Sequence, residues 1–194
     1  MLKYQAVRGT KDILPADCVP VQALEAAARE IFRSYGFGEI RTPTFESVDL
    51  FQRSLGETTD VVQKEMYVFE DRGGRKLALR PEGTAGVVRA FIEHHLSQNH
   101  PFCKLFYIGP MFRAERPQAG RLRQFHQFGV ESFGVSDPRA DVEVISLLWR
   151  LLSDLTLPGL TLEINNLGYT EDRARYKPLL VAFLNGVESR LCGN

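Results

Sequence analysis

Apolar residues recur at three- and four-residue steps in several parts of the chain, a spacing typical of helices with one buried face. The pattern is clearest over Val21–Tyr35, and Gly36 follows at a position where glycine often ends a helix. The same spacing predicts helices over Thr84–Leu96, from about Asp137 to Leu152, and over Glu171–Leu191.

Two of these helices contain further local signals. Asp137 is expected to cap the third helix, with Pro138 at its first position. Pro178 is expected to kink or split the fourth. The residues of the third helix expected to face the core are Val142, Ile145, Leu148, Trp149 and Leu152.

Strands are indicated where apolar and polar residues alternate or where aromatic residues cluster. A hairpin is expected from Tyr67–Phe69 and Lys76–Leu79, because the turn-forming sequence Asp71–Gly74 lies between them. The segment Glu39–Phe45 also looks extended, and its Pro43 favours an edge or interface position. The other segments expected as strands are Cys103–Phe112, Gln124–Phe133 and Leu160–Ile164.

Helices interspersed with hairpin-linked strands predict an α+β fold, built on a largely antiparallel sheet flanked by helices. The 194 residues suit one domain, and no internal repeat or linker divides them. The last residues contain no capping element, so the domain formed by residues 1–194 is expected to be incomplete at its C-terminus.

Composition changes this picture little, since 44% hydrophobic and 25% charged residues are ordinary for a globular protein. Lys plus Arg equal Asp plus Glu, so bulk charge gives no support for nucleic-acid binding. The cysteines and histidines do not show metal-ligand spacing. No apolar run reaches the roughly 20 residues of a membrane span. We therefore expect no metal site, no membrane segment and a cytoplasmic location.

The last of the long strands has one unusual face. Alternate residues of a strand share a face, so Phe125, Gln127, Gly129 and Glu131 are expected to lie together. An amide and a carboxylate beside an aromatic ring are typical of small-molecule sites, which combine apolar walls with a few placed polar groups. A glycine within a strand often marks the close approach of a ligand. This face is therefore predicted to bind a small molecule, whereas His126 is expected on the opposite, packing face.

Four arginines gather between the two long strands: Arg113, Arg116, Arg121 and Arg123. Planar guanidinium groups suit bidentate binding of phosphate, and their place beside the unusual strand face indicates a polyphosphate ligand. The chain contains no P-loop sequence, which excludes a P-loop nucleotide hydrolase. Charge alone favours the alternative interpretation, a solvated hairpin tip.

Four segments, in this order along the chain, share features with one known family. They are residues 8–15, 36–46, 79–85 and 112–131. The first resembles the N-terminal signature of histidyl-tRNA synthetases, and the second resembles motif 1 of class II aminoacyl-tRNA synthetases, including its proline. The third resembles the first histidine-binding segment of the family, and the fourth resembles its motif 2. The resemblance covers nearly the whole chain.

The resemblance implies an ATP site on the loop and the following strand. Arg113 would contact the α-phosphate and stabilise negative charge as the carboxylate attacks, which makes it the implied catalytic residue. Glu115 would accept a hydrogen bond from the adenine amino group, and Phe125 would stack on the ring. Arg121 would reach the terminal phosphates. ATP, with Mg²⁺, is the implied substrate.

The resemblance also implies a histidine site, in which Glu82, Thr84 and Gln127 would hold the α-amino group and Glu131 would bind the imidazole. The alternative for Glu82 is a helix N-terminal acid that favours the helix dipole, and the alternative for Thr84 is a first-turn hydroxyl without a ligand. The implied reaction is histidine plus ATP giving histidyl-adenylate and pyrophosphate, followed by transfer to tRNA(His). Motif 1 further implies a homodimer, for which the alternative is an edge strand protected by Pro43.

Other parts of the family pattern have no counterpart in the sequence. These are motif 3, the second histidine-binding segment and the anticodon-binding domain. Residues 1–194 are therefore expected to form a partial catalytic domain with little or no adenylation activity alone, either as an excised fragment or as a naturally short relative. A non-catalytic paralog resembling the regulatory subunit of ATP phosphoribosyltransferase is the second interpretation, and a free-standing dimerisation module is the third. The presence of Arg113, Glu115, Arg121 and Phe125 favours the synthetase.

Overall fold

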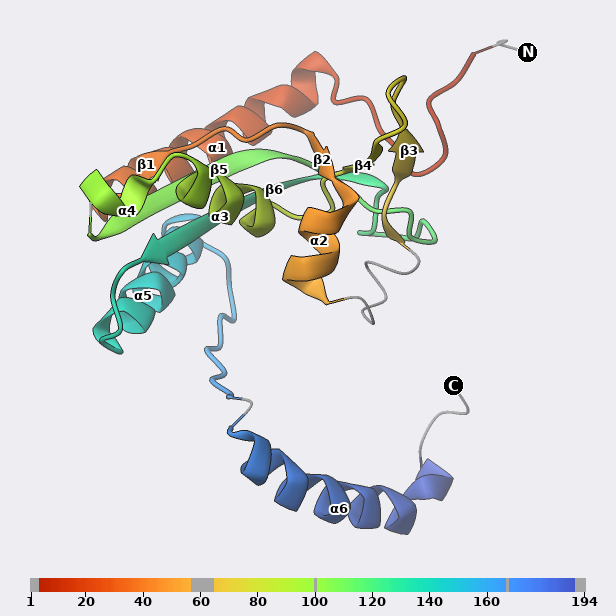
Figure 1. Cartoon of the computed structure of the whole chain (residues 1–194), viewed down its shortest axis with the longest axis vertical. Coiled ribbons are helices and arrows are strands. Elements are labelled where there is room, and N and C mark those ends of the chain that lie inside the picture. Colours follow the sequence, from red (N-terminus) through yellow and green to blue (C-terminus); the bar gives the residue numbers. More distant parts are fainter. Residues whose placement is uncertain (1–3, 57–64, 100, 167, 191–194) are drawn as a thin grey trace. The chain divides into compact units, whose positions relative to one another are not determined.

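The computed structural model describes residues 4–56, 65–99, 101–166 and 168–190. The chain divides into two compact units, Met1–Leu157 and Pro158–Asn194, and each is described by itself. The first unit contains two sheets and the helices up to α5 (Arg139–Asp154) (Figure 1). The second contains α6 (Thr170–Gly186) and a short 3-10 helix, Glu188–Arg190.

Two ten-residue strands form the centre of the first sheet. β5 (Cys103–Phe112) and β6 (Gln124–Phe133) pair antiparallel along their whole length. The short β1 (Gly38–Glu39) pairs in parallel with the other edge of β5. The bounds of both long strands agree with the sequence prediction, because aromatic residues concentrate in the strands and a polar loop separates them.

One face of this sheet is covered by α1 (Pro15–Ser34) and α5. The buried side chains of this core are Ala28, Ile31, Phe32, Phe37, Phe106, Leu147 and Leu151, and Ile108, Phe128 and Val130 pack against them. The rings of Phe32 and Phe106 lie 5.1 Å apart at an interplanar angle of 55°, a favourable tilted contact. The strand residues that face the two helices are therefore even-numbered: Phe106, Ile108, Phe128 and Val130.

The end of α1 sets the course of the chain towards β1. Gly36 has a φ of +81°, its N–H donates to the carbonyl of Arg33, and the N–H of Phe37 donates to the carbonyl of Phe32. This pair of hydrogen bonds is a Schellman motif, completed by the contact between Phe32 and Phe37, each 2% exposed. The predicted helix end is confirmed, whereas the helix begins earlier than predicted, at Pro15, because proline suits the first turn.

The opposite face of the sheet is covered by α3 (Thr84–Glu93). Val87 of α3 is buried with Tyr107 and Met111 of β5. The partly buried residues packed against them are Ile40, Leu105, Phe125 and Phe133. The odd-numbered strand residues thus face α3, and this is the strand face predicted to bind a small molecule.

A second sheet has the strand order β2 (Phe45–Ser47), β4 (Lys76–Leu79), β3 (Val68–Glu70). β3 and β4 form the predicted hairpin, whose turn is fixed by Asp71 Oδ1, which accepts hydrogen bonds from the N–H groups of Gly73 and Arg75 at 2.8 and 3.0 Å. α2 (Val48–Leu55) packs on this sheet, and its Phe51 is buried with Ala85 of α3. Because Ala85 lies in this core and Val87 in the other, α3 joins the two sheets.

Three sequence predictions are wrong in detail. The stretch Glu39–Phe45 is not one strand, because β1 ends at its first residue and β2 begins at its last, each in a different sheet. The helix expected over Thr84–Leu96 is divided at His95, whose φ of +50° separates α3 from α4 (Leu96–Asn99). Leu160–Ile164 forms no strand, since no strand in the described ranges pairs with it.

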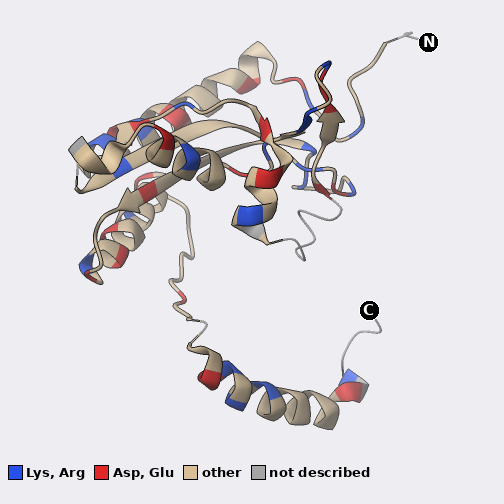
Figure 2. Cartoon of the chain, viewed as in Figure 1, with Lys and Arg blue, Asp and Glu red and all other residues tan. Residues whose placement is uncertain are grey.

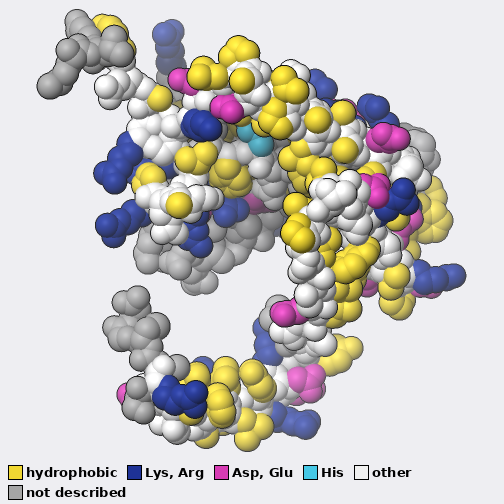
Figure 3. All heavy atoms as spheres, turned by 180° about the vertical axis from the view of Figure 1, so that it is seen from behind, with side chains coloured by type: hydrophobic (Ala, Val, Ile, Leu, Met, Phe, Trp, Pro, Cys, Tyr) yellow, Lys and Arg dark blue, Asp and Glu magenta, His cyan; other side chains and the backbone are white. Residues whose placement is uncertain are grey.

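The buried face of α5 also differs from the prediction. Leu147 and Leu151 are 2% and 0% exposed, whereas Val142, Leu148 and Trp149 are 59%, 49% and 44% exposed. α5 has apolar residues on more than one side, so periodicity alone could not select the face that the core covers. Figure 3 shows hydrophobic side chains at the surface on the face that it presents.

In the second unit, α6 runs without interruption past Pro178, which the prediction expected to kink or split it. The helix ends at Gly186, and the predicted end, Leu191, lies outside the described residues. None of the side chains described in α6 is buried.

Candidate functional site

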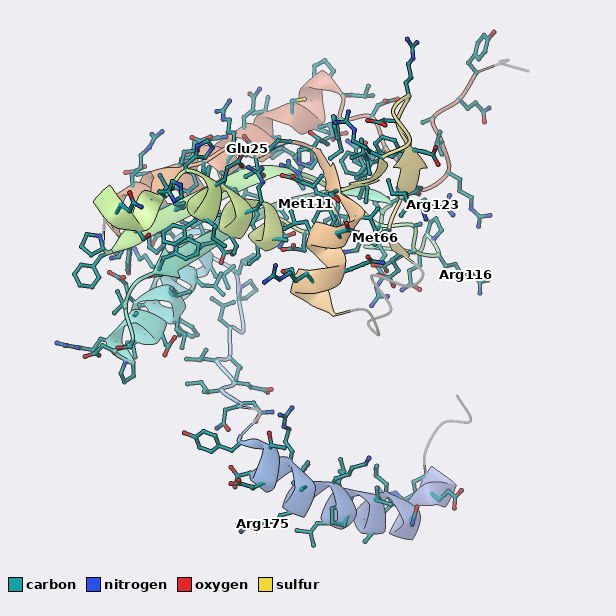
Figure 4. The ribbon with its side chains drawn as sticks, viewed as in Figure 1. Glu25, Met66, Met111, Arg116, Arg123 and Arg175 are labelled. Atoms are coloured by element: carbon teal, nitrogen blue, oxygen red, sulfur yellow. The ribbon has the colours of Figure 1, made fainter. Side chains whose placement is uncertain are left out.

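The loop between β5 and β6 lines a cleft of about 560 Å³. The lining residues are Glu65, Arg113, Glu115, Gly120, Arg121, Leu122, Phe125 and His126. The structure therefore brings together all the residues predicted to contact ATP, namely Arg113, Glu115, Arg121 and Phe125. Arg116 does not belong to this lining and points outward from the loop (Figure 4).

The charged groups of this cleft contact one another. The Glu115 carboxylate lies 3.2 Å from Nη1 of Arg121 and 3.8 Å from Nη1 of Arg113. The guanidinium carbon of Arg113 lies 5.3 Å from the centre of the Phe125 ring, within cation–π range. Arg113 Nε also donates to the carbonyl of Pro81 at 3.0 Å. A polyphosphate entering the cleft would compete with Glu115 for both arginines.

The N-terminal segment holds the base of the loop through Arg123. The N–H of Arg123 donates to the carbonyl of Gly9 at 2.7 Å, and its Nη1 donates to the carbonyl of Arg8 at 3.2 Å. Gly9 has a φ of +89°, and a Cβ there would lie 2.8 Å from the Arg123 side chain. Only glycine adopts this φ without strain and also leaves room for the Arg123 side chain. The structure thus places Arg123 as an anchor of the loop, outside the cleft lining.

A second group of residues lies between α3 and β6. Thr84 Oγ1 donates to Oε1 of Glu131 at 2.7 Å, which links the first turn of the helix to the strand. The Glu82 carboxylate accepts hydrogen bonds from the N–H groups of Thr84 and Ala85. Glu82 therefore caps the start of α3, although its oxygens keep lone pairs for a ligand.

Gln127 adds an unpaired acceptor to this second group. Its Oε1 is buried and has no protein hydrogen-bond partner. Buried polar atoms are nearly always satisfied, so a ligand N–H that reaches this oxygen would remove an energetic cost. Gln127 shares its strand face with Phe125 and Glu131, as the alternation predicted, while none of Glu82, Thr84, Gln127 and Glu131 lines the 560 Å³ cleft.

Tyr107 belongs to this site and was missed by the sequence reasoning. It is 5% exposed and lies directly opposite Gly129 in the β5–β6 ladder. A Cβ at Gly129 would lie 2.5 Å from the phenolic oxygen, and a Cβ at Gly83 would collide with the other side of the ring. Gly129 therefore makes room for Tyr107, and not for a ligand as predicted. Only the strand register reveals this pairing, because Tyr107 is one of several aromatic residues in β5.

Burial shifts two pKa values in the second group. Burial raises the pKa of the Glu131 carboxyl; the Thr84 hydroxyl opposes this shift, and the charge of Glu82 adds to it. Burial likewise raises the pKa of the Tyr107 hydroxyl. A partly desolvated carboxylate favours a cationic or N–H-bearing ligand, and shifted pKa values of this kind concentrate at functional sites.

The described histidines are exposed, but only His126 lines the cleft. His94 and His95 are exposed. His126 is also exposed and lines the cleft, whereas the sequence placed it on the packing face. The reason is that the core formed with α1 and α5 includes Phe128 and Val130 but does not extend to His126.

The described ranges contain no group of three or more His, Cys, Asp and Glu side chains arranged to hold a metal ion. In the same ranges no helix combines the length and apolar character needed to cross a bilayer. The helices α1, α2, α3, α5 and α6 each contain both acidic and basic residues (Figure 2), in keeping with the net charge of zero.

Comparison with known sequences identifies the family. The family model described as histidyl-tRNA synthetase matches residues 9–174. The chain belongs to the histidyl-tRNA synthetase family. It is 55% identical over 193 residues to the histidine–tRNA ligase of Aquifex aeolicus, covering 100% of this chain and 48% of that protein. It is 60% identical over 185 residues to the ligase of Parasynechococcus marenigrum, covering 95% of this chain and 43% of that protein.

Solved structures agree with this family and with the predicted α+β class. The apo histidyl-tRNA synthetase of S. aureus superposes with a TM-score of 0.73 at 41% identity, over 99% of this chain and 44% of that one. A Bacillus halodurans protein described as an ATP phosphoribosyltransferase regulatory subunit/histidyl-tRNA synthetase superposes with a TM-score of 0.69 at 26% identity. The match covers 81% of this chain and 39% of that one. The chain thus spans slightly less than half the length of the relatives it matches.

Proposed function

We propose that this member of the histidyl-tRNA synthetase family forms part of the catalytic domain of a histidine–tRNA ligase, which activates histidine with ATP and transfers it to tRNA(His). The observation that supports this most directly is the arrangement along one face of β6. Phe125 borders the arginine-lined cleft, and Gln127 and Glu131 follow on the same face beside α3. Substrates bound next to each other along one strand face would be held near each other, and such proximity is a major source of catalysis.

ATP is the proposed ligand of the cleft. Its phosphates would replace the Glu115 carboxylate as the partner of Arg121, and its adenine would replace the Arg113 guanidinium over the Phe125 ring. Arg113 would then contact the α-phosphate and stabilise charge during attack by the histidine carboxylate. Mg²⁺ binds few protein ligands and favours phosphate and water oxygens, so it would enter with ATP.

Histidine is the proposed ligand of the second group. The half-buried carboxylate of Glu131 suits an imidazole N–H, and the unpaired Oε1 of Gln127 suits an α-amino N–H. Glu82 and Thr84 would complete the amino-group site from the start of α3, using the acceptor capacity that their helix-capping contacts leave free.

The proposal concerns the complete gene product, meaning the whole reading frame in which residues 1–194 lie. Because the chain spans less than half of its relatives, motif 3 and the second histidine-binding segment would come from outside these residues. The tRNA contacts, a homodimer built on the segment around Pro43, and a cytoplasmic location belong to the same proposal.

The competing function is a non-catalytic regulatory subunit, which the fold shared with the Bacillus halodurans protein favours. A protein with that role does not need adenine and phosphate contacts. Arg113, Glu115, Arg121 and Phe125 nevertheless line one cleft, and the identity to the Aquifex aeolicus ligase is 55%. Both observations favour the ligase.

The test is histidine-dependent ATP–pyrophosphate exchange by the complete gene product. We expect exchange with histidine, and Glu131→Ala should weaken histidine binding by about 1–3 kcal/mol because buried polar groups are left unpaired. Glu188→Ala, on the exposed 3-10 helix, is the matched control and should leave histidine binding unchanged. Histidine binding without exchange would establish the regulatory alternative, and residues 1–194 alone should show little or no exchange.

A further inference from the structure

Arg80 is the only buried charged residue among the described residues, with an exposed fraction of 9%, and it is not one of the residues proposed to bind substrate. It lies just after β4, at the point where the chain leaves the second sheet for α3. Burial lowers the pKa of its guanidinium. Its acceptors are backbone carbonyls and a hydroxyl rather than carboxylates, so no acidic side chain neutralises it among these contacts.

The guanidinium bridges two segments that are distant in sequence. Nε donates to the carbonyl of Pro110 near the end of β5, at 2.9 Å. Nη1 donates to the carbonyl and the hydroxyl of Thr42, at 3.0 and 3.3 Å, and lies 3.5 Å from the carbonyl of Pro43. Arg80 therefore ties the stretch before β2 to the end of β5.

The backbone beside Arg80 makes further contacts with the same end of β5. The N–H of Phe112 donates to the carbonyl of Arg80 at 3.0 Å, and Nε of Arg113 donates to the carbonyl of Pro81 at 3.0 Å. Gly109 has no room for a side chain, because a Cβ there would collide with Nη2 of Arg80. Contacts from Arg80 and Pro81 thus fix the end of β5 and the side chain of Arg113, which follows it.

We propose that Arg80 is a positioning residue for adenylation, which fixes the end of β5 and so orients the Arg113 guanidinium towards the α-phosphate. The inference rests on the proposed function, since it needs Arg113 to act on ATP. A buried arginine is a costly way to join two segments when only stability is required, because apolar side chains often stabilise a core as well or better. What an arginine adds is a rigid fork that donates in two directions, which the ammonium group of lysine does not reproduce.

The test compares Arg80→Lys and Arg80→Met in the complete gene product, with rates normalised to the number of folded active sites by burst titration. We expect kcat for ATP–pyrophosphate exchange to fall about a hundredfold in both variants, with KM for histidine within about twofold of wild type. Arg29→Met is the matched control, because Arg29 is also partly buried and hydrogen-bonded but contacts Glu25 and Glu39. Its kcat should stay within about twofold of wild type.

A double-mutant cycle separates positioning from general stability. If Arg80 acts through Arg113, the double variant of Arg80→Met and Arg113→Met should be about as slow as Arg113→Met alone. Independent, multiplicative losses would overturn the proposal, as would wild-type kcat in Arg80→Lys. Gly109→Ala provides a second variant should Arg80→Met fail to fold, because it displaces the guanidinium without removing it, and it should lower kcat in the same way. Absence of exchange in the wild-type protein would instead refute the proposed function.

Discussion

Gly129→Ala tests the packing that surrounds Tyr107. The added methyl group would lie 2.5 Å from the phenolic oxygen and 2.6 Å from the ring carbon that bears it, well inside the 3.4 Å at which ordinary contact begins. The ring cannot retreat, because the backbone at Gly83 blocks its other side and Tyr107 is only 5% exposed. Overpacking costs about 1–3 kcal/mol, and this confinement places the expected loss in the upper half, at about 2–3 kcal/mol.

Urea unfolding of residues 1–194, followed by the fluorescence of Trp149, measures this loss. Trp149 is the single tryptophan of the chain, and it lies on α5, which packs on the same sheet. With an m-value of about 2 kcal/mol/M, the midpoint should fall by about 1–1.5 M. Gly38→Ala in β1 is the matched control, because a Cβ there meets only the Lys104 carbonyl at 3.9 Å. Its free energy of unfolding should stay within about 0.5 kcal/mol of wild type. An unchanged midpoint for Gly129→Ala would refute the packing argument.

Three further predictions concern charge and loop anchoring. Burial raises the pKa of Glu131 above its ordinary value of 4.5, so the contribution of this carboxyl to stability is full below that pH and is lost as the pH rises through the folded-state pKa. Glu131→Gln should therefore gain stability relative to wild type as the pH rises above 4.5, and a difference in urea unfolding that does not change with pH would contradict this. Gly9→Ala in the complete gene product should raise KM for ATP roughly tenfold through backbone strain, with KM for histidine unchanged in exchange kinetics. Lys104→Met, which removes the 2.7 Å ion pair with Glu143, should cost about 1 kcal/mol in thermal unfolding, while the exposed Arg150→Met costs less than about 0.5 kcal/mol.

The elements that were predictable from the sequence are those whose signal is local. The long strands β5 and β6 have aromatic-rich sequences bounded by polar turns, and both were predicted with their observed bounds. The Schellman end of α1 at Gly36 and the turn at Asp71 depend on residues within a few positions of each other. Each of these features is determined by neighbours in the chain, so tertiary contacts are not needed to identify it.

The errors arise where tertiary contacts decide between local alternatives. α5 offers two apolar faces, and packing against α1 selects the one with Leu147 and Leu151. Glu39–Phe45 has an extended character, but its two ends belong to different sheets. Leu160–Ile164 has a strand-like sequence, but a strand requires a partner to satisfy its backbone.

The residues of the candidate site show the same difference between local signals and tertiary contacts. Alternation along β6 predicted that Phe125, Gln127 and Glu131 share a face, because strand periodicity is fixed. Tyr107 and Arg80 could not be predicted, since the role of Tyr107 depends on the strand register and that of Arg80 on backbone carbonyls as acceptors. Carbonyl positions become known only once the fold is known.

The two parts of the site differ in how far the fold positions their side chains before a ligand binds. The group around Glu131 is built on α3 and β6, with Ala85 fixed in one core and Val87 in the other, so its geometry exists before a ligand binds. The ATP group depends on a loop whose arginines contact Glu115, so a phosphate ligand must first replace an existing ion pair. Preorganised groups bind without a further ordering cost, whereas exchanging partners in a loop reduces the net gain from each phosphate contact. The affinity for ATP should therefore depend on anchors outside the cleft, such as Arg123 and Arg80, more strongly than the affinity for histidine does.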